Sequence, residues 1–130
     1  MDNIINFITN TKGITTSTPV LPELIVESQK LLRVRFSEDY KEMLLNFGAL
    51  MYHGNTILGL NPEHKYDCVS VTIDMKEFDE DIPANMYVIM MADIDSLLFL
   101  QDECGNVYKH FPMQGFQLIA NNLEDFLFTL

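Results

Sequence analysis

The residues best able to do chemistry are carboxylates that crowd one part of the chain. The stretch EFDEDIPANMYVIMMADID covers residues 77–95 and surrounds an apolar run with acidic side chains. Such a cluster could form a metal site, an acid–base pair or a charged surface for a partner. The carboxylates within the stretch are Glu77, Asp79, Glu80, Asp81, Asp93 and Asp95, and Asp74 lies three residues before it.

Catalysis finds little support in the residue pattern. With so many carboxylates, almost any pair could be proposed for acid–base work, so no pair is informative. The sequence contains no G-x-S-x-G, no H-E-x-x-H and no glycine-rich phosphate loop. His53 and His110 stand near the ends of expected strands, and we interpret them as ordinary partly buried side chains. We therefore expect no catalytic residue, no enzyme activity and no cofactor.

Metal binding is disfavoured by ligand spacing. His64 and Cys68 are four residues apart, and Cys104 and His110 could add two ligands. A structural zinc site usually shows a closer pair such as C-x-x-C. Asp93-x-Asp95 begins like a calcium loop, but the apolar letters LLFL follow where further oxygen ligands would be needed. We expect no metal site and two free cysteines.

Charge favours a basic protein as the partner. The net charge is −11, from 8 basic and 19 acidic residues. Residues 74–103 hold nine acidic side chains against Lys76 alone, so this segment carries −8 of the total. Phosphate binding needs clustered Lys and Arg, so we expect no nucleic-acid partner and no binding to anionic membranes. A basic protein or a cation would be attracted over long range. The alternative, which is commoner among acidic proteins, is that the charge only keeps the protein soluble.

Length and hydropathy indicate one domain, residues 1–130. No apolar run is long enough to cross a bilayer. The first residues, MDNIINFITNTK, have Asp2 where a signal peptide would carry a basic residue. We therefore expect a cytoplasmic protein.

Periodicity predicts an α+β fold with a mainly antiparallel sheet, N-terminal helices and a C-terminal helix packed on it. The clearest helix begins at Ser37, a good cap, and ends at Gly48. Further helices are expected over 2–10, 19–33 and 122–130. Strands are expected over 50–53, 56–60, 87–92, 97–101 and 107–110. Residues 69–76 alternate strictly between apolar and polar side chains, which also favours a strand.

These elements separate the carboxylates. Glu77–Asp81 leads into the strand at 87–92, and Asp93 and Asp95 follow it. The two groups should then flank opposite ends of the strand, roughly 20 Å apart. One metal could not join them, so a charged surface is the better interpretation. Tyr108, Phe111 and Phe116 either line a groove for a partner or cover the sheet, and the sequence does not decide between these uses.

Three segments resemble the SUKH superfamily, the group of Smi/Knr-type immunity proteins. LLRVRFSEDYKEMLLNFGAL resembles its opening signature, IPANMYVIMMADIDSLLFLQDECGNVYKH its central "Y-x-x-I-G-x-D-G" and "G-x-V-Y" motifs, and IANNLEDFLFTL its closing "A-x-S-F-x-E-F-L". The resemblance covers about 18–130. The matching residues are Leu32, Asp39, Tyr40, Lys41, Leu44, Gly48, Pro83, Asp93, Asp102, Gly105, Val107 and Tyr108.

The resemblance implies an α+β fold in which the counterpart of 65–78 tends to be helical, against the strand that alternation favours. It also implies a bacterial cytoplasmic immunity protein that binds and neutralises a polymorphic toxin, often a nuclease, without catalysis. The alternative is a regulatory adaptor with no toxin. We expect a basic toxin domain as the partner and a monomer or weak homodimer. The expected binding residues are Asp79, Glu80, Asp81, Asp93, Asp95, Asp102, Glu103 and Tyr108.

Overall fold

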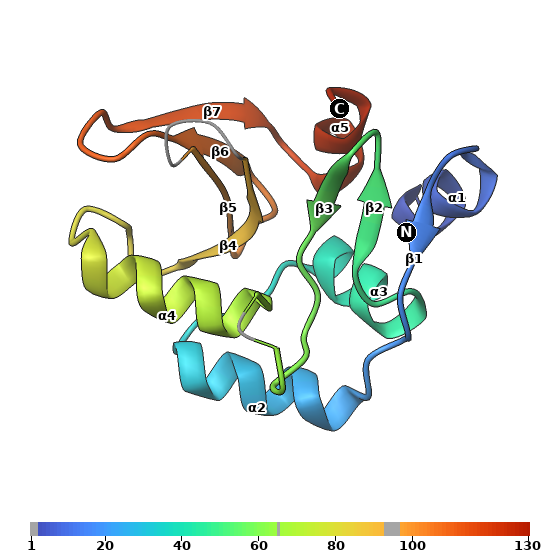
Figure 1. Cartoon of the computed structure of the whole chain (residues 1–130), viewed down its shortest axis with the longest axis horizontal. Helices are drawn as coiled ribbons and strands as arrows, with labels where there is room; N and C mark the ends of the chain where they lie inside the picture. Colours follow the sequence, from blue (N-terminus) through green and yellow to red (C-terminus); the bar gives the residue numbers. More distant parts are fainter. Residues whose placement is uncertain (1–2, 65, 93–96) are drawn as a thin grey trace.

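A computed structural model describes residues 3–64, 66–92 and 97–130 (Figure 1). These residues form five helices and seven strands, which confirms the predicted α+β class. The helices are α1 (Asn3–Asn10), α2 (Pro22–Leu32), α3 (Glu38–Asn46), α4 (Cys68–Phe78) and α5 (Leu123–Phe128). The strands are β1 (Thr15–Thr16), β2 (Leu50–Tyr52), β3 (Asn55–Ile57), β4 (Met86–Met91), β5 (Leu98–Asp102), β6 (Val107–His110) and β7 (Phe116–Ala120).

The strands divide between two antiparallel sheets, ordered β1-β2-β3 and β4-β5-β6-β7. In the larger sheet Met91 of β4 pairs with Leu98 of β5, and Leu98 pairs with His110 of β6. The backbone N–H of Leu58, just after β3, donates to the carbonyl of Ile89 at 2.7 Å. This bond joins the two sheets along the β4 edge, so β4 is enclosed on both sides.

The alternating segment at 69–76 is a helix, so the strand interpretation is wrong and the expectation from the family resemblance is right. Asp67 caps α4 by accepting the backbone N–H of Ser70 at 2.8 Å. The residues that α4 buries are Cys68, Val71 and Thr72, which follow helical spacing. Ile73, one of the apolar residues in the alternating segment, is 39% exposed.

The hydrophobic core lies between the larger sheet and the helices. The rings of Phe36, Tyr40 and Tyr87 contact one another there, with Tyr40 stacked on Tyr87 at 5.4 Å. From α5, Phe126 reaches Phe99 of β5 at 5.2 Å. Helix α4 packs against the β4 edge and runs beside α2 (Figure 1). Within the described ranges, no helix is long and apolar enough to span a membrane.

Candidate functional site

Asp79, the first of the predicted binding residues, holds the end of α4 to the sheet. Its Oδ2 lies 2.7 Å from Nε2 of His110 in β6. Its Oδ1 accepts the backbone N–H of Asp81 at 3.0 Å. The bond to His110, together with that N–H, lowers the pKa of the Asp79 carboxyl below its ordinary value. Asp79 therefore has a structural task as well as a charge.

This contact corrects the predicted separation of the acidic groups. His110 pairs with Leu98 and Leu98 with Met91, so Asp79 lies at the end of β4 where the strand finishes. The prediction placed it at the start of the strand. It missed that α4 ends near Met91, so that residues 79–85 must run back along the strand to reach Met86. Asp93 and Asp95 lie outside the described residues.

Glu80 and Asp81 are exposed at this end of α4, together with Glu77. The ion pairs found in the described ranges are Lys41–Glu38 and His110–Asp79, and neither involves these three carboxylates. The neighbouring cation, Lys76, turns its Nζ to the carbonyl of Ala84 at 3.0 Å. Among the described residues, no side chain forms an ion pair with the exposed carboxylates at the end of α4.

Asp102 is buried and shapes the turn between β5 and β6. Its carboxylate accepts the backbone N–H groups of Cys104 and Asn106 at 2.9 and 3.0 Å, and the hydroxyl of Tyr108 at 3.1 Å. Burial and this carboxylate raise the pKa of the Tyr108 hydroxyl. Asp102 and Tyr108 therefore hold a loop in shape. Beside them Glu103 is exposed and accepts the backbone N–H of Arg35 at 2.9 Å.

The predicted residues therefore fall into two places. Asp79, Glu80 and Asp81 lie where β4 ends, whereas the turn with Asp102, Glu103 and Tyr108 lies where β4 begins, because Met86 pairs with Asp102. Glu80, Asp81 and Glu103 are exposed, and Glu103 is already hydrogen-bonded. The two carboxylates most available to a partner are thus Glu80 and Asp81.

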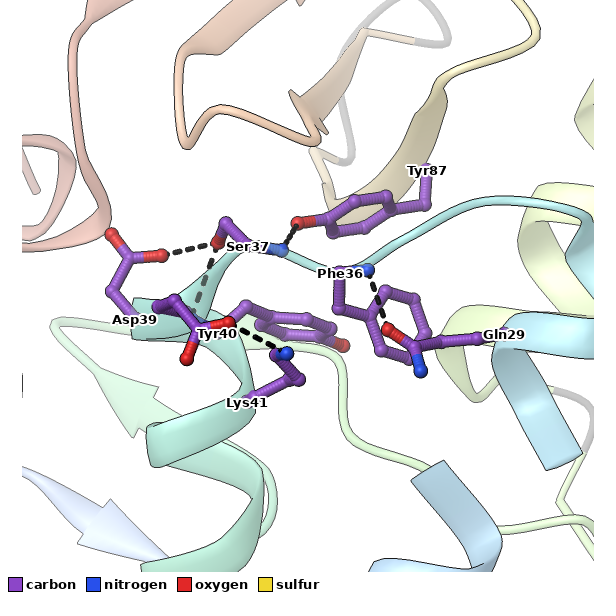
Figure 2. Close-up of polar contacts among 8 residues, drawn as sticks. Gln29, Phe36, Ser37, Asp39, Tyr40, Lys41 and Tyr87 are labelled. Carbon is purple, nitrogen blue, oxygen red and sulfur yellow. Dashed lines mark hydrogen bonds and ion pairs between the residues drawn. The ribbon is translucent and has the colours of Figure 1, made fainter. Parts of the chain in front are cut away.

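A buried polar network that the sequence did not reveal ties α3 to the larger sheet (Figure 2). The backbone N–H of Ser37 donates to the Tyr87 hydroxyl at 2.8 Å, and that hydroxyl donates to Gln101 at the same distance. The Gln101 amide donates in turn to Asp39 at 3.1 Å and to the Gly105 carbonyl at 3.0 Å. The network fixes the β5–β6 turn from inside.

Replacing Asp39 by alanine is expected to lower the free energy of unfolding by about 2 kcal/mol. Its carboxylate accepts the N–H of the buried Leu123 at 2.7 Å and the Gln101 amide, so its loss leaves a buried donor unpaired. Glu38→Ala is the control, because Glu38 is exposed and forms a surface ion pair with Lys41. It should cost less than about 1 kcal/mol. Urea unfolding measures both, and equal losses would contradict the role given to Asp39.

The groups considered for chemistry are placed apart. Burial raises the pKa of the Cys68 thiol to about 12, so the thiol stays protonated and is a poor nucleophile. Cys104 is exposed in the β5–β6 turn, and neither cysteine forms a disulfide. His110 is buried against Asp79. The part of the chain with described positions holds no group of three His, Cys, Asp or Glu side chains that could bind a metal ion.

Comparison with known proteins gives one family. Residues 1–129 match the family SUKH_5, described as "SMI1-KNR4 cell-wall". A search of curated proteins found no match for this chain. The family match spans the acidic end of α4, the β5–β6 turn and the buried network alike.

Proposed function

The chain belongs to the SUKH superfamily of SMI1-KNR4 proteins, and on that premise we propose that it is an immunity protein. In this proposal it binds a cognate toxin domain in the cytoplasm of the bacterium that makes the toxin, and blocks it without catalysis. The observation that carries the proposal is the exposed carboxylate surface at the end of α4, formed by Glu77, Glu80 and Asp81. We call these three residues the acidic cap.

Electrostatics supports a nuclease as the toxin. A nuclease must hold phosphate, so its active face is expected to be basic. The acidic cap would attract such a face and speed association, and occupying the face would exclude the nucleic acid. The net charge of −11 reinforces the attraction at low salt.

Co-expression tests the proposed function. The toxin gene that neighbours this one would be expressed alone and together with this protein. Survival and copurification of the two chains are expected. If the cells die at the same rate with and without this protein, and no complex is recovered, the proposal fails.

Reversing the charge of the acidic cap is expected to slow toxin association. Glu80→Lys with Asp81→Lys should lower the association rate constant about tenfold or more at low salt, with a smaller difference at high salt. Asp79 is left unchanged, because its bond to His110 would confound the result. The matched control is Glu23→Lys with Glu27→Lys, two exposed carboxylates on α2. Stopped-flow or surface binding measures the rate, and equal slowing in both variants would locate the interface elsewhere.

A regulatory adaptor is the second candidate function. The family description refers to the cell wall and not to a toxin, so a role other than toxin neutralisation is the alternative. Such an adaptor would still bind a protein through the acidic cap. The co-expression experiment separates the two candidates, because an adaptor gives no protection against a toxin.

A further inference from the structure

An apolar groove opens beside the acidic cap. It has a volume of about 300 Å³. It lies between the C-terminal end of α4, the end of β4, the start of β5 and the loop after β6. Its most exposed wall is Phe78, the last residue of α4, which is 77% exposed. The lining residues are Met75, Phe78, Asp79, Met91, Ala92, Leu97, Leu98 and Pro112.

The end of α4 therefore combines a largely exposed aromatic side chain with exposed carboxylates. A largely exposed phenylalanine costs free energy in water, and aromatic side chains of this kind commonly act as anchors in protein interfaces. Glu77 and Glu80 flank Phe78 in the sequence at one and two residues, and both are exposed. The groove is lined by Phe78 and Asp79, and the exposed carboxylates adjoin these two residues along the chain. An apolar groove next to such carboxylates is complementary to an apolar side chain that has cations on both sides.

We propose that this groove binds a segment of the partner protein in which one large apolar side chain is flanked by lysines or arginines. The inference rests on the proposed function and names the part of the toxin that is recognised. The apolar side chain enters between Phe78 and Leu97, and the flanking cations pair with Glu77, Glu80 or Asp81. The groove gives slow dissociation, and the acidic cap gives fast association.

Size and charge disfavour two other occupants, a small molecule and a second copy of this chain. About 300 Å³ lies at the lower limit for a pocket that holds a drug-sized ligand, and it suits one or two side chains better. A second copy of this chain would bring a further net charge of −11 toward the acidic cap, so self-association through this face is opposed. Asp79, held by His110, fixes the position of the α4 end and hence of the Phe78 wall.

A synthetic peptide tests the inference without the toxin. The probe carries one phenylalanine flanked on both sides by two arginines, and its controls replace either the phenylalanine by alanine or the arginines by glutamates. In ¹⁵N-resolved NMR spectra of the full chain, the probe is expected to shift the amide signals of Phe78, Met91 and Leu97. Neither control peptide should do so. Shifts that are equal for the probe and the alanine control would show charge attraction only and would overturn the groove.

Phe78→Ser is the matching protein variant, and Leu31→Ser on α2 is its control, since Leu31 is 68% exposed. Phe78→Ser should weaken peptide binding about tenfold or more while the unfolding midpoint stays unchanged. Full toxin protection by Phe78→Ser, with unchanged affinity, would reject the groove and leave the proposed function standing. Peptide binding at the groove without any protection against the toxin would reject the function and leave the groove standing.

Discussion

Gly48→Ala is expected to lower the free energy of unfolding by about 4 kcal/mol, the largest effect predicted for this protein. Gly48 follows α3 with φ +76°, where an alanine is strained by about 1–2 kcal/mol. A Cβ there would also lie 2.2 Å from the carbonyl oxygen of Thr18, closer than two atoms can approach. Relieving that overlap means moving backbone, which adds to the loss.

The segment that would move is itself pinned. The N–H of Ser17 donates to the carbonyl of Ala49 at 3.0 Å, and the N–H of Val20 donates to that of Leu44 at 2.8 Å. A shift of Thr18 therefore stretches bonds on both of its sides. Gly54→Ala is the control, because Gly54 has φ +79° but no atom within 4 Å of its Cβ position. Urea unfolding should give it a loss of about 1–2 kcal/mol; a loss as large as that of Gly48→Ala would contradict the role of the Thr18 contact.

The helix-ending role of Gly48 could be predicted from the sequence because it depends on neighbouring residues. The same holds for the helix start at Ser37, whose hydroxyl oxygen accepts the N–H of Tyr40, and for the cap at Asn122. The β5–β6 hairpin followed from the Gly105-Asn106 turn signal. Each of these features is a contact over a few residues, so spacing along the chain suffices to find it.

Strand β7 and helix α4 show where spacing fails. In residues 116–120 the consecutive side chains Gln117 and Leu118 are both exposed, and the pairing with β6 shifts in register between Leu118 and Ala120, so no alternation marks this segment as a strand. In α4 the apolar residues alternate as in a strand, yet the buried residues follow helical spacing. The sequence signal that favours the helix is the N-cap residue Asp67. When the apolar residues of a short segment fit both a helix and a strand, the elements that pack against it determine its secondary structure. Here that partner is the β4 edge, where the N–H of Val88 donates to the Thr72 hydroxyl at 2.9 Å.

The candidate site was predicted in part for the same reason. Glu80 and Asp81 are exposed as expected, because a charged stretch after a helix needs no long-range contact to be solvated. Asp102 was expected at the surface and is buried, since its partners are backbone groups of the turn, which composition cannot show. The groove beside Phe78 is formed by residues from α4, β4 and β5 together, so it could not be predicted from any single segment.

His110→Ala is expected to lower the free energy of unfolding by about 3 kcal/mol at neutral pH. The ring is 1% exposed and stacks on Phe116 at 4.0 Å, so its removal leaves a cavity. It also removes the contacts of the ring nitrogens with the Asp79 Oδ2 and the Gly115 carbonyl, each at 2.7 Å, and leaves Asp79 with the N–H of Asp81. His53→Ala is the control, because His53 is exposed, with its ring against the Leu130 carbonyl and the Tyr52 ring. Its loss should stay below about 1 kcal/mol.

The pH dependence separates the contribution of the Asp79–His110 hydrogen bond from that of the cavity. His110 holds the pKa of Asp79 below its ordinary value of 3.8, so the carboxylate contributes stability that is fully present above that pH. The contribution is lost as the pH falls below 3.8 through the folded-state pKa. The difference between the natural chain and His110→Ala, measured by urea unfolding, should therefore shrink over that range, and the part that remains belongs to the cavity and the stacking. A difference that stays constant with pH would mean that Asp79 gains nothing from His110, and that the α4 end, with its Phe78 wall, is held by packing alone.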